Sequence, residues 1–309
     1  MKESARSIGA ALLGMPAAGT EALGAVEQSA SAEHSVFRLT RGETAWYLKI
    51  AGETELRREL AVLRLLRASG LPVPEVEASD ADGKITGRCC LLLREVTGRP
   101  FTDASPDFMR VAPILRRVHE LRVDGSGYLS PAAGGDARLT GADESWGEAL
   151  RHRIGNLQPI ADAGLADGAL LDRAAASVAS RISALAARPT GYLLHGDFHP
   201  RHVYARDGQI TAIIDWGDAS SGDPLYDFGR ILHAAVLRRG IEHGEEVVRR
   251  FSDAYGSSPW LAGDVAEAIG SYAVVFILAS MRSELAGGSP WPPWWPAQCA
   301  ALAEILGSL

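Results

Sequence analysis

The sequence is poor in cysteine, with only three among 309 residues. Cys89 and Cys90 are neighbours in an apolar run and Cys299 lies far along the chain, so a disulfide framework is excluded. The sequence also has no Cys-x-x-Cys pair, which argues against a structural zinc site. Such cysteine usage is typical of a reducing compartment, and we expect a cytoplasmic protein.

Long hydrophobic runs and an excess of basic residues are missing too. The longest apolar run, Ala273–Ala279, is far shorter than the ~18 residues of a membrane-spanning helix. The 31 Lys and Arg residues against 38 Asp and Glu give a formal net charge of −7. An acidic protein lacks the basic surface that nucleic acids require. We therefore expect neither a membrane nor a nucleic acid as partner, whereas a cationic ligand is compatible with the charge.

What the chain does have is ordinary globular composition. Hydrophobic residues make up 47% and charged residues 22%, enough for a sizeable core and against global disorder. The length favours two domains or one domain with two lobes. The segment Ile8–Ala18, which follows Lys2 and Arg6, weakly resembles a signal peptide but is more typical of an amphipathic first helix.

The first hundred residues indicate a strand-rich lobe with one helix. His34–Leu39 and Ala45–Ile50 read as strands joined by a turn. Leucines at spacings of three and four predict a helix over Glu53–Ala68. Leu91–Leu93 reads as a buried strand, and the connector Arg94–Pro100 follows it. We therefore place an N-terminal lobe at residues 1–96 and a C-terminal lobe at 97–309.

The remainder reads as mostly helical. We expect Gly125–Asp143 to be a surface loop because it is rich in Gly, Ala and Asp. Short strands are expected between Tyr192 and Trp216. The predicted helices of this part are Phe108–Leu121, Ala169–Leu185, Leu225–Arg239, Glu245–Tyr255, Ala262–Leu285 and Ala297–Leu306.

Carboxylates and imidazoles concentrate in one stretch. Asp197 follows the apolar run Tyr192–Leu194 after His195-Gly196, and Asp215 follows Ile213-Ile214. Each carboxylate therefore lies where a buried element ends. Two such groups could hold one divalent cation and supply one proton acceptor.

Other interpretations of this stretch are weaker. A metal-dependent hydrolase could use the same residue types, but the His-Glu-x-x-His spacing is absent and Pro200 forbids a regular helix between the histidines. For His195 and His199 we expect hydrogen bonds to the loop backbone rather than a metal. We expect Asp227 to brace this loop from the following helix.

These residues resemble the motifs of the aminoglycoside phosphotransferase family. The pattern is His195-Gly196-Asp197 with His202 five residues after the aspartate, then Ile214-Asp215-Trp216-Gly217 and Gly222-Asp223-Pro224. The N-terminal order also resembles that of the family, with Lys49 in a strand, Glu59 in the following helix and then Leu71–Val76. Val118–Leu121 resembles its Leu-His motif. The family consists of antibiotic kinases and related small-molecule kinases. It implies an α+β, bilobal, protein-kinase-like fold with a small N-terminal antiparallel sheet lobe and a larger, mostly helical C-terminal lobe.

The resemblance also implies roles for residues. Asp197 would be the catalytic base that orients the acceptor hydroxyl. Lys49 would pair with the phosphates of ATP or GTP, and Glu59 would hold Lys49, although Glu55 competes for that role. The hinge at Arg94–Gly98 would bind the base through its backbone, which adds Glu95 and Val96 to the nucleotide-binding residues.

Two features depart from the family pattern. Asp215 and His202 are the expected metal ligands, yet most relatives have Asn where this chain has His202, whereas macrolide phosphotransferases have His there. A neutral imidazole can ligate a divalent ion, but Mg²⁺ prefers oxygen ligands. We therefore expect Mg²⁺ as the metal, with tolerance for Mn²⁺ because of the nitrogen of His202. The phosphate loop, Ser29–Ser35, has no glycine. Ser35 is its candidate nucleotide contact.

The acceptor is less well defined by sequence. Candidate substrate-binding residues in the expected helical lobe are acidic or aromatic: Asp218, Glu144, Trp146, Tyr272, Glu284, Trp291, Trp294 and Trp295. The acidic ones suit a polycationic antibiotic, whereas His202 points to a large apolar one. The tryptophans could instead form a packed corner.

Three functions stay open. The first is an antibiotic O-phosphotransferase acting on an aminoglycoside, macrolide or cationic peptide hydroxyl and conferring resistance. The second is a metabolic kinase with a sugar, choline-like or amino-alcohol acceptor. The third is an inactive kinase-like binding module, against which Lys49, Asp197 and Asp215 together argue. The expected partners are a nucleoside triphosphate and a small-molecule acceptor, with the chain a monomer or homodimer.

Overall fold

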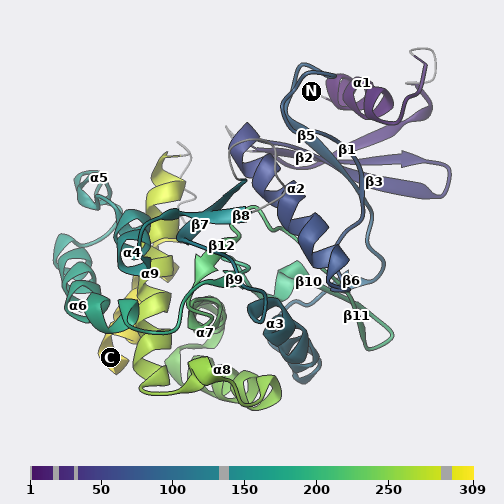
Figure 1. Cartoon of the computed structure of the whole chain (residues 1–309). Helices are drawn as coiled ribbons and strands as arrows, with labels where there is room; N and C mark the ends of the chain where they lie inside the picture. The colour runs from purple at the N-terminus through teal and green to yellow at the C-terminus, as the bar shows by residue number, and fades with distance from the viewer. Residues whose placement is uncertain (1, 17–20, 31–33, 132–138, 287–293) are drawn as a thin grey trace. The chain divides into compact units, whose positions relative to one another are not determined.

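The computed structural model describes residues 2–16, 21–30, 34–131, 139–286 and 294–309 (Figure 1). The chain divides into two compact units. We call them unit 1 and unit 2 and describe each by itself.

Unit 1 takes segments from three places in the chain. It comprises Met1–Arg99, Ser130–Leu139 and Tyr204–Asp218, and unit 2 comprises Pro100–Leu129, Thr140–Val203 and Ala219–Leu309. The first segment ends three residues after the expected boundary at residue 96. The segment Tyr204–Asp218 is connected to unit 1 by strand pairing with Arg99–Pro100, which the sequence separation does not reveal.

A five-stranded antiparallel sheet forms the centre of unit 1, in the order β1-β2-β3-β5-β4. Its strands are β1 (Gly24–Ala30), β2 (Ser35–Arg41), β3 (Thr44–Ile50), β4 (Val76–Asp80) and β5 (Cys90–Arg94). The strands expected at β2, β3 and β5 are confirmed. Strands β1 and β4 were not predicted, because their short, polar sequences lack a clear alternation.

Two helices flank this sheet. Helix α1 (Lys2–Leu12) buries Ala5 and Ile8 against Phe37, Leu39 and Leu48. The expected amphipathic first helix is therefore confirmed. Helix α2 occupies Glu53–Ala68, the range predicted from its leucine spacing. Because side chains alternate along a strand, Tyr47 and Lys49 lie on the face of β3 opposite Leu48.

A second, three-stranded sheet has the order β11-β10-β6. It consists of β6 (Arg99–Pro100), β10 (Val203–Arg206) and β11 (Gln209–Ile213). A hydrogen bond of 2.6 Å from Thr211 Oγ1 to the Thr97 carbonyl ties the hairpin to the connector before β6. The connector is thereby held at a defined place in unit 1.

Unit 2 contains most of the helices (Figure 1). Their bounds are η2 Pro106–Val111, α3 Ala112–His119, α4 Trp146–Ile154, α5 Gln158–Asp162, α6 Gly168–Ala186, η3 Pro200–His202, α7 Leu225–Arg239, α8 Ile241–Tyr255, η4 Pro259–Leu261, α9 Val265–Ala286 and α10 Trp294–Ser308. All six helices that we predicted for this part are found, with ends shifted by a few residues. Helices α4 and α5 were not predicted.

A four-stranded sheet, β8-β7-β12-β9, accompanies these helices. Its strands are β7 (Ser126–Pro131), β8 (Leu139–Asp143), β9 (Tyr192–Leu194) and β12 (Ser220–Gly222). The prediction of a surface loop over Gly125–Asp143 is therefore wrong at both ends of that segment, because strands β7 and β8 lie there. Glycine is used here for close backbone approach, because a Cβ on Gly141 would lie 2.3 Å from the main-chain nitrogen of Ser126.

Helix α9 is the one described helix that is long and apolar enough to cross a membrane by length and composition. The apolar-run criterion missed it, because the run is interrupted by small and polar residues. Of its most apolar window, 61% is buried by the rest of the protein. It packs against α7, α4 and α10, so it forms the central core helix of unit 2.

Candidate active site

A buried lysine surrounded by three carboxylates lies on strand β3 of unit 1. The ammonium of Lys49 is 2.8 Å from Glu59, 3.1 Å from Glu55 and 3.2 Å from Asp215. Burial by itself would lower the pKa of Lys49, but the three carboxylates outweigh it and hold that pKa well above its ordinary value. Lys49 is therefore a permanent cation.

Helix geometry explains why both glutamates reach the lysine. Glu55 and Glu59 are four residues apart in α2 and so share one face of that helix. Glu59 is 2% exposed, and burial raises its pKa against the opposing effect of Lys49. Our expectation that Glu59 pairs with Lys49 holds in the structure, and Glu55 joins the pair rather than replacing it. The ammonium of Lys49 is thus shared by the carboxylates of Glu55, Glu59 and Asp215.

Asp215 has an unusual backbone conformation directly after β11. Its φ is +64°, and Asp207 is the only other non-glycine residue with positive φ in the described parts of the chain. Such a conformation costs about 1–3 kcal/mol and concentrates at functional sites. The next residue, Trp216, anchors the turn through a buried 2.9 Å hydrogen bond to the Ile213 carbonyl. The strained turn presents the Asp215 carboxylate, whose side chain is 48% exposed.

The connector of unit 1 borders a cavity of about 660 Å³. Glu95, Val96 and the following residues to Arg99 form one part of its lining, and Tyr47 and Tyr204 contribute aromatic rings. Burial, with a contribution from Glu95, raises the pKa of both tyrosines. Their hydroxyls stay neutral at physiological pH, and their rings give the lining two aromatic surfaces beside its charged residues.

Glu95 is held in place by an ion pair with β2. The Arg38 guanidinium donates a hydrogen bond of 2.9 Å from Nη2 to Glu95. This hydrogen bond lowers the pKa of Glu95, with desolvation opposing it. Ser35, the candidate contact of the phosphate loop, starts β2 and pairs with Ile50. Residues 31–33 of that loop lie outside the described residues.

In unit 2, Asp227 braces the loop that carries Asp197. Its carboxylate accepts hydrogen bonds from the main-chain N–H groups of His195 and Gly196, at 2.8 and 2.9 Å. The His119 ring lies 3.0 Å from the same carboxylate. Burial opposes ionisation, but these hydrogen bonds hold the pKa of Asp227 below its ordinary value. The structural role that we expected for Asp227 is confirmed.

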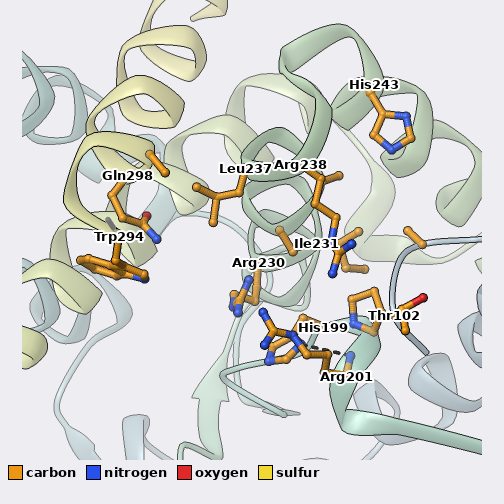
Figure 2. A pocket seen from close by; sticks show the side chains of 15 residues that line it. Thr102, His199, Arg201, Arg230, Ile231, Leu237, Arg238, His243, Trp294 and Gln298 are labelled. Carbon is orange, nitrogen blue, oxygen red and sulfur yellow. Dashed lines mark hydrogen bonds between the residues drawn. The ribbon is translucent and has the colours of Figure 1, made fainter. Parts of the chain in front are cut away.

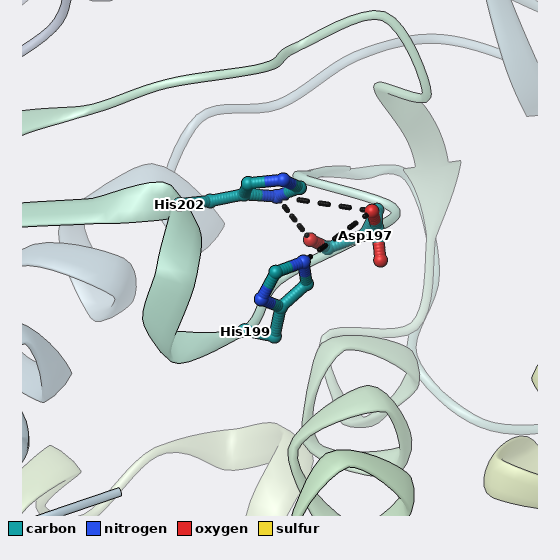
Figure 3. Close-up of side chains that lie close together, drawn as sticks. All are labelled: Asp197, His199 and His202. Atoms are coloured by element: carbon teal, nitrogen blue, oxygen red, sulfur yellow. Dashed lines mark hydrogen bonds and ion pairs between the residues drawn. The ribbon is translucent and has the colours of Figure 1, made fainter. Parts of the chain in front are cut away.

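Asp197 lies beside the imidazoles of His199 and His202 (Figure 3), and the guanidinium of Arg230 contacts it as well. Arg230 donates to its Oδ1 at 2.6 Å, and ring nitrogens of His199 and His202 are each 3.8 Å from its Oδ2. His199 Nδ1 accepts a hydrogen bond from the Arg201 N–H, the backbone role that we expected. Burial and then the positive charge of Arg230 lower the pKa of His199 strongly, so that ring is neutral.

The ring of His202 is oriented by the main chain. Its Nδ1 is 3.0 Å from the Asp197 carbonyl, which can only accept, so Nδ1 carries a proton. Nearby atoms of Asp197, His199 and His202 could in principle gather a metal ion. The three-residue set does not fit one, because His202 Nδ1 is committed to that carbonyl and Arg230 already neutralises Asp197. His202 can ligate only through Nε2.

The expected substrate residues do not form one group. Trp146 and Tyr272 are core side chains, since the Trp146 Nε1 donates to the Tyr272 hydroxyl at 3.0 Å and both are at most 2% exposed. Trp295 is also 2% exposed. The prediction that Trp146, Tyr272 and Trp295 contact the substrate directly is therefore wrong.

The remaining candidates are spread over both units. Glu144 and Glu284 are exposed in unit 2, and Asp218 is exposed in unit 1. Trp294 lines a cavity of unit 2, and Trp291 lies outside the described residues. Their common acidic or aromatic character therefore does not correspond to a common location.

Three residues of the site were not predicted from the sequence: Tyr47, Tyr204 and Arg230. Tyr47 could have been found, because it lies two residues before Lys49 and so shares its strand face. No local pattern predicts the pairing of Arg230 with an aspartate 33 residues earlier.

A sheet unit with a buried lysine–glutamate pair and a helical unit with a braced aspartate loop define a kinase-like phosphotransferase fold. Comparison with known families agrees. The model of the phosphotransferase enzyme family matches residues 25–267, so the chain belongs to that family.

Solved structures share the fold. A thermostable mutant of aminoglycoside phosphotransferase APH(4)-Ia, in ternary complex with ADP and hygromycin B, is 18% identical with a TM-score of 0.68 over 98% of each chain. Macrolide 2'-phosphotransferase MphH from Brachybacterium faecium is 18% identical with a TM-score of 0.55 over 91% of this chain and 92% of its own.

A curated relative matches this chain over a small part of its own length. Acyl-CoA dehydrogenase family member 11 of Gallus gallus is 24% identical over 226 residues, 70% of this chain and 28% of that protein. The matches span less than a third of the length of the curated relatives. The comparisons thus establish the family and the fold.

Proposed function

We propose that the protein transfers the γ-phosphate of ATP or GTP to a hydroxyl of a small molecule. The observation that carries this is the combination of the buried Lys49–Glu59 pair beside Asp215 with a braced Asp197 loop. Phosphoryl transfer needs positioning and charge neutralisation more than covalent help from the protein. Unit 1 offers the cation and the carboxylate for the phosphates, and unit 2 offers the base.

Two residues, one in each unit, are each of a type that can ligate a divalent cation. Asp215 has a carboxylate oxygen and His202 an imidazole nitrogen, the kinds of atom that ligate divalent ions. When bound, Mg²⁺ supplies neutralisation of phosphate charge. Lys49 adds a fixed positive charge, and Glu59 and Glu55 keep its side chain in place. Replacing Asp215 by Ala should abolish the metal-dependent part of nucleotide binding in calorimetry.

The cavity beside the connector suits the nucleobase. Tyr47 and Tyr204 offer rings for stacking, and the connector from Glu95 to Arg99 offers main-chain groups for the base edge. We expect Tyr204→Ala to weaken ATP binding by roughly five- to tenfold, since an aromatic stacking contact contributes about 1 kcal/mol. A matched control is Tyr128→Ala, which removes an exposed tyrosine of unit 2.

Asp197 takes the part of the general base. Its carboxylate orients the acceptor hydroxyl and receives the hydroxyl proton as the oxygen attacks the γ-phosphorus, while the nucleoside diphosphate leaves. The Asp227 brace keeps the loop rigid, which such positioning requires. The retained Lys49, Asp197 and Asp215 argue against an inactive binding module.

The acceptor has two candidate classes. An antibiotic hydroxyl, with resistance as the outcome, is favoured by the likeness to the APH(4)-Ia structure with hygromycin B and to the macrolide 2'-phosphotransferase. A metabolic alcohol is favoured by a cavity of unit 2 whose charge does not suit a polycation.

A coupled assay of nucleoside diphosphate release tests the function. The wild type is supplied with ATP or GTP, Mg²⁺ or Mn²⁺, and a panel of aminoglycosides, macrolides, cyclic peptides, sugars, amino alcohols and hydroxy acids. We expect acceptor-dependent release that Asp197→Asn removes. No acceptor-dependent release with any member, together with no nucleotide binding, would contradict the proposal.

A further inference from the structure

Unit 2 contains a cavity of about 280 Å³ formed by α7, the start of α10 and the loop after Asp197 (Figure 2). Fifteen residues line it. No aspartate or glutamate is among them. Every lining residue that can carry charge is basic: His199, Arg201, Arg230, Arg238 and His243.

Arg230 connects this cavity to the candidate base. Its Nε donates to Asp197 Oδ1, and its guanidinium lies over the Phe276 ring at 4.5 Å from the centroid. Its Nη1 is buried, and within the described residues it has no hydrogen-bond partner. Leaving a buried charged N–H unpaired is costly, and an anion in the cavity would stabilise the Arg230 guanidinium as a whole.

Arg201 and Arg238 add charge to the same space from two different elements. Both are exposed, and in the described parts of the chain neither takes part in an ion pair. Guanidinium groups stay protonated at any physiological pH and match the planar oxygens of carboxylate or phosphate. Because Arg230 is already paired with Asp197, the net positive charge of the cavity comes from Arg201 and Arg238, and a bound anion would neutralise it.

With burial, Arg230 also lowers the pKa of a second buried side chain, that of His233. Burial and then Arg230 lower the pKa of His233 to about 3. His233 is therefore neutral, and its Nε2 lies 2.7 Å from Gln298, another lining residue. The wall of the cavity thus keeps a positive potential that comes from the arginines.

We propose that this cavity binds the anionic group, a carboxylate or phosphate monoester, of the alcohol that accepts the phosphoryl group. The proposal rests on the proposed function and names its substrate class. Arg230 lines the cavity while its Nε stays on Asp197, so an anion bound there brings the acceptor's hydroxyl toward the base. The volume of about 280 Å³ is just below the roughly 300–1,000 Å³ of ligand pockets, so the acceptor is compact.

The first experiment compares matched acceptors in the wild-type enzyme with ATP and Mg²⁺. D-glucose is the neutral member, D-gluconate the carboxylate, glucose 6-phosphate the phosphate monoester and hygromycin B the polycation. We expect a kcat/KM for at least one of the two anionic members that exceeds glucose and hygromycin B by at least about tenfold. Which anionic member is preferred separates carboxylate from phosphate. Transfer to glucose or hygromycin B at an equal or higher rate overturns the proposal while leaving the proposed function intact.

The second experiment measures binding without nucleotide, so that it does not depend on catalysis. Inorganic phosphate and malonate are titrated calorimetrically into the wild type, Arg238→Gln and Arg239→Gln. Arg239 is the matched control, because it is exposed, follows Arg238 in α7 and does not line the cavity. We expect Arg238→Gln to weaken at least one anion by about fivefold or more, and Arg239→Gln to have no effect.

The outcomes distinguish the anion site from the proposed kinase function. Weakening that is equal in the two variants, or no binding of either anion to the wild type, overturns the anion site. Anion binding that Arg238→Gln weakens, in an enzyme that fails to bind nucleotide, supports the site and contradicts the kinase function. Circular dichroism of each variant verifies that the fold is retained.

Discussion

The guanidinium of Arg230 donates a 2.6 Å hydrogen bond to the carboxylate of Asp197. Arg230 holds the carboxylate of the candidate base in one orientation and occupies one of its two oxygens. Because both side chains are largely buried, the pair is a defined part of the site rather than a surface contact.

Asp197→Asn should lower kcat by roughly 10²-fold or more, since an amide cannot take the hydroxyl proton. The Kd for nucleotide should stay within about threefold, because unit 1 carries the nucleotide-binding groups. Steady-state kinetics and calorimetry measure the two. Asp107→Asn, at a side chain that is 69% exposed, is the control. Near-normal turnover of the Asp197 variant would exclude it as the base.

Lys49→Met should weaken nucleotide binding and also destabilise the fold. Glu59 would remain buried without its cation, and breaking a buried ion pair typically costs about 3 kcal/mol or more. Denaturant unfolding of the ligand-free protein measures this. Lys84→Met is the control, because Lys84 is 80% exposed in its pair with Asp82 and a surface pair contributes little. Equal effects of the two substitutions would contradict a structural role of the Lys49–Glu59 pair.

His202→Asn should change the metal preference of the enzyme. Mn²⁺ accepts nitrogen ligands more readily than Mg²⁺, so the wild type should show a higher Mn²⁺-to-Mg²⁺ activity ratio than the variant. We expect the ratio to fall by about fivefold or more on substitution, measured as kcat/KM for ATP with each metal. His152→Asn, at a side chain 65% exposed, is the control. An unchanged ratio would mean that His202 does not ligate.

Asp227→Asn should destabilise unit 2 by about 3 kcal/mol near neutral pH, because the amide nitrogen would face a main-chain N–H donor. The lowered pKa of Asp227 sets the pH dependence. Its stabilisation is fully present above the unfolded pKa of about 3.9 and is lost as pH falls through the lower folded pKa.

The stability gap between the wild type and Asp227→Asn should therefore shrink below about pH 4. Urea unfolding at several pH values measures the gap. Asp253→Asn, at an exposed side chain paired with Arg249, should change stability by less than about 0.5 kcal/mol. A gap that stays constant from pH 7 to pH 3 would contradict the ionised brace.

Much of the architecture was determined by the sequence itself. The leucine spacing of Glu53–Ala68 predicted α2 to the residue, and the loop motifs identified Asp197, Asp215 and Asp227. These features are local, since helical periodicity and the placement of a carboxylate at the end of a buried run are properties of short segments.

Tertiary structure alone decided the pairings between distant segments. It brought Glu55 as well as Glu59 to Lys49, buried Trp146 and Tyr272 in the core, and turned an expected loop into β7 and β8. It also joined Arg230 to Asp197. Charge and burial at these positions depend on which elements pack together, and that packing is not encoded in the neighbouring residues of any one of them.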